Sequence, residues 1–144
     1  MAMGNFMVDS NLSRYPRSIR KVMCFGTFDN LHPGHRSFLE QVKKHGDHLI
    51  VVVARDRNVK KLKGKWPREK EKIRWQKVKN LSFVDEVVLG QLKNKFKIIK
   101  KYKPAVICLG YDQAVDIHKL KKVFSGRIVR LKPYKERIYK SSKL

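Results

Sequence analysis

The stretch Lys21–His35, KVMCFGTFDNLHPGH, decides the fold of this 144-residue chain. Its first part contains an unbroken apolar run, residues 22–25, which is typical of a strand covered on both faces, as in a parallel sheet. Gly26 ends that run, and Pro33 lies where a fixed φ and a missing N–H suit the first turn of a helix. The stretch therefore predicts a strand that turns directly into a helix.

Two histidines, His32 and His35, stand three residues apart at this helix start and therefore face the same way. The first turn of a helix has unpaired N–H donors and a partial positive charge, and Gly26 and Gly34 let the main chain approach a ligand closely. Imidazoles placed there can donate hydrogen bonds to phosphate oxygens while charge builds during phosphoryl or nucleotidyl transfer. The corner therefore predicts a nucleotide phosphate site, although a histidine at a helix start also fits a simple capping role.

The whole string Gly26–His35, GTFDNLHPGH, resembles the signature of the cytidylyltransferase-like branch of the nucleotidyltransferase superfamily. The H-x-G-H element of that signature is matched by His32, Gly34 and His35. The resemblance runs from about Lys21 to Lys143 and is strongest with archaeal FAD synthases, which adenylylate FMN. The stretches that carry this second resemblance are VARDRNVKKLKG at 53–64, LGQLKNK at 89–95 and LGYDQ at 109–113.

The resemblance implies a role for each matching residue. His32 and His35 are implied to stabilise charge on the reacting phosphates, and Lys60 to hold the triphosphate or the leaving pyrophosphate. Asp29 and Arg74 are implied to contact the second substrate. The residues implied to bind the nucleotide are Gly26, Thr27, Phe28, Gly34, Lys61, Gly110, Tyr111, Asp112, Tyr139, Ser141 and Ser142.

Plainer interpretations of several of these residues stay open. The lysines within 60–63 also fit a solvated run of charges, and Arg74 also fits a surface cation on a helix. Asp112 also fits a helix N-cap. The tail, residues 133–144, matches the I-S-T-T-[KR]-I segment of the family only loosely, because the usual arginine and glycine are not clearly present.

Beyond the corner, apolar strand-like runs alternate with segments of helical spacing. Strands are predicted at 21–25, 47–54, 84–89, 104–109 and 127–131, and helices at 33–45, 68–81, 93–102 and 115–124. Residues 55–67 are predicted to form a polar, cationic loop at the carboxyl edge of the sheet, where open α/β sheets bind ligands. The alternation predicts an α/β fold, a single Rossmann-like, doubly wound, five-stranded parallel sheet of order 3-2-1-4-5. That order brings Gly26–His35 and Gly110–Gln113 to one cleft.

Length and composition favour one domain with a packed core. Residues 1–20 show no clear period and are predicted to be a flexible leader, with the nucleotidyltransferase domain at 21–144. No apolar run approaches the roughly 20 residues of a membrane span, and the start lacks the apolar core of a signal peptide, so we expect a cytoplasmic protein. Cys24 and Cys108 lie in apolar runs and are predicted to be buried, and no spacing of ligand residues indicates a metal site in the protein.

Charge is the unusual feature of the composition, with 35 Lys and Arg against 12 Asp and Glu and a net charge of +23. Such a charge attracts nucleotides, nucleic acid and acidic membranes without choosing among them, and a solvated lysine-rich surface explains it equally well. Nucleic acid is therefore a candidate partner by charge alone, and no membrane partner is expected.

The resemblance implies an enzyme that transfers AMP from ATP to FMN, giving FAD and pyrophosphate, with Mg²⁺ bridging the phosphates of the nucleotide. One alternative is a CTP-dependent cytidylyltransferase that acts on glycerol 3-phosphate or a similar phospho-alcohol. A second alternative is a basic nucleic-acid-binding module on the same fold. The resemblance also raises the expectation of a homodimer.

Overall fold

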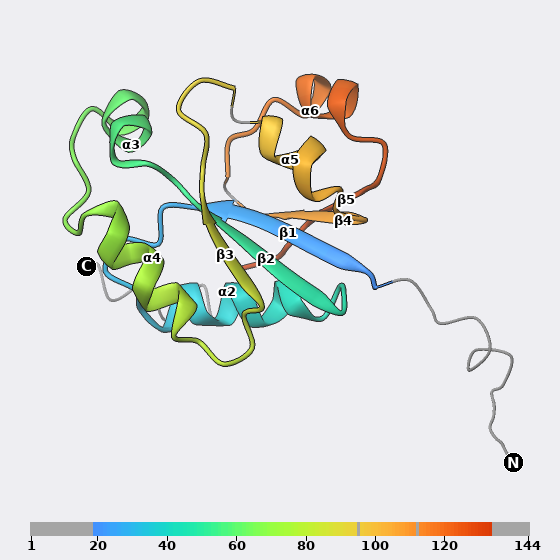
Figure 1. Ribbon diagram of the computed structural model, residues 1–144, viewed down its shortest axis with the longest axis horizontal. Coiled ribbons are helices and arrows are strands. Elements are labelled where there is room, and N and C mark those ends of the chain that lie inside the picture. Colours follow the sequence, from blue (N-terminus) through green and yellow to red (C-terminus); the bar gives the residue numbers. More distant parts are fainter. Residues whose placement is uncertain (1–18, 95, 112, 134–144) are drawn as a thin grey trace, which may run out of the picture.

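The computed structural model of the chain describes residues 19–94, 96–111 and 113–133. Five strands form one sheet in the order β3-β2-β1-β4-β5, and every neighbouring pair is parallel (Figure 1). The strands are β1 Lys21–Gly26, β2 His48–Val53, β3 Glu86–Leu89, β4 Val106–Leu109 and β5 Arg127–Arg130. The predicted Rossmann-like α/β fold and its strand order are confirmed.

Helices lie on both faces of the sheet (Figure 1). The helices are α2 Pro33–Lys43, α3 Asp56–Lys63, α4 Glu71–Lys79, α5 Lys97–Tyr102 and α6 Ile117–Val123. Leu39 and Val42 of α2 and Val78 of α4 pack in one core cluster with strand residues. Ile99 of α5 and Leu120 of α6 pack in a second cluster on the other face. The doubly wound arrangement therefore follows from burying apolar side chains on both sides of the strands.

The strand β1 is covered on both faces, as its unbroken apolar run predicts. Val22 and Cys24 belong to the first core cluster, and Met23 belongs to the second. Cys24 stands opposite Cys108 of β4 in the register, and both thiols are free and buried, as predicted. Burial raises the pKa of both thiols, that of Cys108 to about 12, so that neither is a reactive thiolate near neutral pH.

The helix α3 corrects the prediction of a loop at 55–67. It ends at Gly64, whose φ of 82° is left-handed and whose N–H donates to the carbonyl of Lys60 at 2.8 Å. Val59 is the one buried residue of this helix, so that its seven other positions carry no apolar stripe. A short helix that buries a single side chain leaves almost no periodic signal in the sequence.

The carboxyl ends of the strands are held together by the first residues beyond them. Ala54 N donates to Gly26 O, Gly90 N to Val53 O and Leu131 N to Leu109 O, each at 2.8 or 2.9 Å. This edge carries the turn after β1 and the turn after β4.

Among the described residues, no helix is long and apolar enough to cross a membrane.

The opposite edge of the sheet begins at Arg20, the last residue of the predicted leader. Its N–H donates to Asp47 Oδ2 at 2.9 Å, and its carbonyl accepts from Asp47 N at 2.7 Å. Residues 1–18 lie outside the described residues, so the leader stays a prediction.

Gly46 gives a test of packing at this edge. A Cβ at Gly46 would lie 2.7 Å from the carbonyl oxygen of Arg20, a main-chain atom fixed by its own hydrogen bonds. We expect Gly46→Ala to lower the free energy of unfolding by about 1–3 kcal/mol, because the main chain must shift. Urea unfolding measures this, with the exposed Ser82→Ala as control; equal stability of the two variants would contradict the packing described.

Candidate active site

The two histidines of the H-x-G-H element cap the start of α2 reciprocally. His32 is the N-cap, and its Nδ1 accepts from Gly34 N at 3.0 Å. The Nδ1 of His35 accepts from His32 N at 3.3 Å. The rings are stacked, with centroids 3.7 Å apart and planes 22° apart. Because Nδ1 of His35 accepts a backbone N–H, the neutral ring of His35 carries its proton on Nε2, which is then a hydrogen-bond donor.

His35 is neutral at physiological pH. Partial burial, the neighbouring His32 and Lys63 together lower the pKa of His35 to about 4, against a smaller opposing effect of Asp29. A neutral imidazole is a hydrogen-bond donor through Nε2 without being a cation. Its chemistry toward a phosphate is therefore donation of a hydrogen bond that strengthens as negative charge builds on oxygen.

Phe28 packs against the ring of His35. It is 4% exposed, has a left-handed φ of 52°, and meets the His35 ring edge-on with centroids 5.7 Å apart. A Cβ at Gly26 would lie 2.7 Å from the Phe28 ring, so that glycine is required there by close packing. Gly26 and Phe28 are predicted to contact the nucleotide, and they also determine the conformation of this corner.

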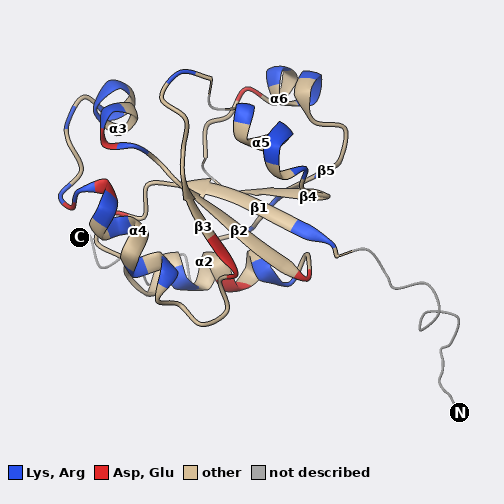
Figure 2. Cartoon of the chain, in the orientation of Figure 1, with Lys and Arg blue, Asp and Glu red and all other residues tan. Residues whose placement is uncertain are grey.

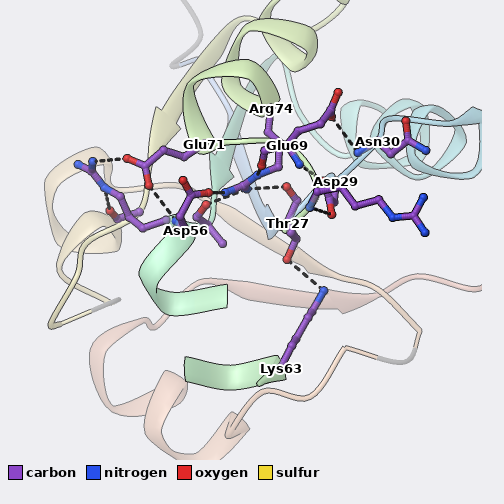
Figure 3. A network of polar contacts seen from close by, with 12 residues as sticks. Thr27, Asp29, Asn30, Asp56, Lys63, Glu69, Glu71 and Arg74 are labelled. Carbon is purple, nitrogen blue, oxygen red and sulfur yellow. Dashed lines mark hydrogen bonds and ion pairs between the residues drawn. The ribbon is translucent and has the colours of Figure 1, made fainter. Parts of the chain in front are cut away.

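A clamp of polar contacts holds residues 27–30 against the segment before α4 (Figure 3). The carboxylate of Asp29 accepts from Arg68 N at 2.7 Å and from Glu69 N at 2.9 Å. Asn30 N donates to Glu69 Oε1 at 2.9 Å. Burial would raise the pKa of Asp29, but the two backbone donors and the nearby arginines hold it below its usual value. Asp29, predicted to contact the second substrate, is seen here to bind main chain.

Arg74 is the centre of this clamp. Its side chain is 0% exposed. Its Nε donates to Glu69 O, Nη1 donates to Thr27 O and Ala54 O, and Nη2 pairs with Asp56 Oδ1, at 2.6–2.9 Å (Figure 3). A guanidinium so enclosed is not a surface cation, and its predicted contact with the second substrate stays a prediction. Arg74 instead positions the turn that follows β1.

The lysines of α3 differ in how they lie relative to the corner. Lys63 Nζ donates to Thr27 Oγ1 at 3.3 Å, and so reaches the corner from the last turn of the helix. Lys60 Nζ donates to the carbonyl of Gly64 at 2.9 Å, and Lys61 is exposed. The structure thus brings Lys63 to the histidines' turn, while the phosphate contacts of Lys60 and Lys61 stay predictions.

Two residues that sequence reasoning did not single out join the turns after β1 and β4. Gln113 accepts from Gly110 N at 3.0 Å and donates to Phe25 O at 3.1 Å. Arg130 of β5 donates to Gly110 O at 2.8 Å and to Gln113 O at 2.7 Å. These contacts place Gly110 and Tyr111 beside the end of β1, as the strand order predicts. The only sequence signal for Gln113 was its place in the stretch LGYDQ.

Several predicted nucleotide contacts, namely Asp112, Tyr139, Ser141 and Ser142, lie outside the described residues. Within the described ranges, no group of three His, Cys, Asp or Glu side chains could hold a metal ion.

A parallel α/β sheet with a histidine-capped helix start at its switch point defines a nucleotide-binding domain of the nucleotidyltransferase class. The family model described as Cytidylyltransferase-like matches residues 23–142. The chain belongs to the cytidylyltransferase-like family, which confirms the resemblance predicted from its H-x-G-H string.

Comparison with individual proteins shows which members of this family the chain is similar to. The chain is 46% identical to the FAD synthase of Ferroglobus placidus, over 78% of this chain and 72% of that protein. It is 44% identical to the FAD synthase of Aciduliprofundum boonei, over 79% of each chain. The crystal structure of the lipopolysaccharide core biosynthesis protein from Thermoplasma volcanium is similar, with a TM-score of 0.75, 38% identity, and coverage of 81% of this chain and 99% of that chain.

The buried guanidinium of Arg74 gives a test of the clamp. Arg74→Met should lower the free energy of unfolding by about 3 kcal/mol, because it leaves three carbonyls and the Asp56 carboxylate without their donor. Lys72→Met, an exposed position on the same helix, should change it by less than about 0.5 kcal/mol. Urea unfolding of both variants measures the difference, and equal stabilities would contradict the clamp.

The depressed pKa of His35 gives a pH test. Between about pH 6.5 and about pH 4, the unfolded chain binds a proton at His35 that the folded chain excludes, so stability falls as pH falls through this window. The loss from pH 7 to pH 5 should be about 1–2 kcal/mol larger in the wild type than in His35→Asn. NMR titration of the His35 ring checks the cause directly; a midpoint near 6.5 would contradict it.

Proposed function

We propose that this chain is an FMN adenylyltransferase, which transfers AMP from ATP to FMN and releases FAD and pyrophosphate. The observation that carries the proposal is identity of 39–46% with FAD synthases across at least 78% of the chain. The local chemistry agrees, because two stacked imidazoles lie at a glycine-rich turn of the sheet edge and the neutral His35 carries its proton on Nε2.

In this reaction a phosphate oxygen of FMN attacks the α-phosphorus of ATP. A new P–O bond forms while the bond to the bridging oxygen breaks, and pyrophosphate leaves with the electron pair. The transfer needs positioning and charge neutralisation rather than a covalent nucleophile on the protein. We assign charge stabilisation at the α-phosphate to His32 and His35, and a contact with the outer phosphates to the α3 lysines, with Lys63 the best placed.

Magnesium fits this assignment as a companion of the nucleotide rather than as a resident of the protein. Mg²⁺ keeps several waters and binds mainly through substrate phosphates, so that few carboxylates are required. Two acidic side chains beside the corner, Asp29 and Asp56, already bind main chain and Arg74. The ion would supply neutralisation of the phosphate charge.

The proposal is tested by pyrophosphate release from ATP or CTP with FMN, glycerol 3-phosphate, phosphocholine or phosphopantetheine as acceptor. We expect release only with ATP and FMN together, and FAD as the product. Release only with CTP would exclude the flavin assignment but keep the nucleotidyltransferase class. Salt-steep RNA or DNA binding without any release would favour a nucleic-acid-binding module instead.

The histidine donor can be removed without removing the cap. In His35→Asn, the side-chain oxygen lies near the place of Nδ1 and can still accept from His32 N, while the Nε2–H donor is lost. We expect kcat to fall by roughly 100-fold or more, with little change in stability near pH 7. His45→Asn, two residues beyond the end of α2, is the matched control. Unchanged turnover of His35→Asn would remove His35 from the mechanism.

A further inference from the structure

A cavity of about 360 Å³ opens between the start of α3, the start of α4 and the turn after β3. Asp56 and Glu71 form part of its wall. The buried Arg74 lies between Asp56 and the carbonyl of Thr27 in the corner, and Figure 3 shows Asp56 and Glu71 on the opposite side of Arg74 from Asp29. The cavity is therefore distinct from the H-x-G-H corner, and its volume is within the range of small-molecule sites.

An exposed aromatic ring forms one wall of this cavity. Trp66 is 58% exposed, and Leu92, which also lines the cavity, is 50% exposed. Within the described part of the chain, the indole N–H of Trp66 has no hydrogen-bond acceptor. A large ring left in solvent beside a second apolar side chain is an unused stacking surface for a flat ligand.

Three cations stand around the same cavity with unused donors. Arg57, Lys70 and Lys72 all line it and are all exposed. None of their side chains forms a hydrogen bond or ion pair with another described residue. Figure 2 shows Lys and Arg gathered on α3, on the connection to α4 and at the start of α4. The rim is thus suited to an anion.

The two carboxylates in the wall do not cancel this charge. Asp56 is paired with Arg74 at 2.6 Å. Glu71 is paired with Arg55 at 3.1 Å and accepts from Asp56 N at 2.8 Å. Each carboxylate has its own guanidinium, so the three remaining cations are the charge that a ligand meets.

We propose that this cavity is a second binding site, which takes a flat aromatic ring carrying a phosphate group. The ring stacks on Trp66 beside Leu92, and the phosphate binds at Lys70 and Lys72 with Arg57. A purine nucleotide and a flavin nucleotide both have this chemistry. The site does not depend on the proposed function, because none of its residues belongs to the H-x-G-H corner.

Equilibrium dialysis with AMP, FMN, riboflavin and inorganic phosphate tests the site on the full chain. We expect the wild type to hold one more equivalent of AMP or FMN per chain than Trp66→Ala at concentrations that saturate the wild type. Stacking on one ring predicts a roughly 10- to 100-fold loss of affinity at this site in Trp66→Ala. Whichever of AMP and FMN gives the extra equivalent identifies the purine or the flavin source.

Charge is tested separately. Lys70→Ala combined with Lys72→Ala should weaken AMP or FMN at this site about tenfold and riboflavin much less, because riboflavin lacks the phosphate. Lys97→Ala combined with Lys100→Ala removes the same charge from α5 and should leave binding unchanged. Circular dichroism and thermal melting establish that each variant is folded.

Two results would overturn the site. The first is the same number of bound nucleotides with the same affinity in the wild type and in folded Trp66→Ala. The second is binding of a single-stranded oligonucleotide, but of neither mononucleotide, through Trp66, which would make this face a nucleic-acid surface. Because dialysis involves no turnover, both results are independent of the pyrophosphate assay.

Discussion

The rest of the structure depends on satisfying one buried positive charge. The guanidinium of Arg74 has no exposure, and a charge removed from water must be fully paired or it destabilises the fold by several kcal/mol. Its partners come from the turn after β1 (Thr27), the end of β2 (Ala54), the start of α3 (Asp56) and the segment before α4 (Glu69). Three stretches of chain, at Thr27, at 54–56 and at Glu69, can therefore occupy only one mutual arrangement.

The contacts of Arg74 also affect the position of the histidines, because Arg74 holds the turn that follows β1. The turn contains Phe28 and Asn30, both with left-handed φ angles, which are costly for a side chain as large as phenylalanine unless the surroundings fix them. Phe28 then packs on His35, and His35 receives the main-chain N–H of His32. The orientation of the His35 ring is consequently set by the packing of Phe28 and by the His32 N–H, before any ligand binds.

The sequence was informative wherever a feature repeats or is local. Continuous apolar runs predicted five parallel strands, and the glycine and proline around the H-x-G-H string predicted the strand-to-helix corner. Contacts across the chain were not predictable in the same way. A lone arginine in a charged helix reads as a surface residue, so the burial of Arg74 follows only from where Thr27 and Asp56 come to lie. Likewise Gln113 joins two turns only because it donates to the carbonyl of Phe25 in β1, a residue 88 positions away in the sequence.

The two free, buried thiols in the centre of the sheet have a practical consequence for chemical labelling. Cys24 and Cys108 are both fully enclosed and resist ionisation, so maleimides and other electrophiles will find no native target while the chain is folded. A cysteine introduced on the surface would then be the sole labelling position, without prior removal of either native residue. Spin labels, fluorophores or tethers can therefore be attached at such a position alone. Reaction at Cys24 or Cys108 would instead report that the sheet itself has opened.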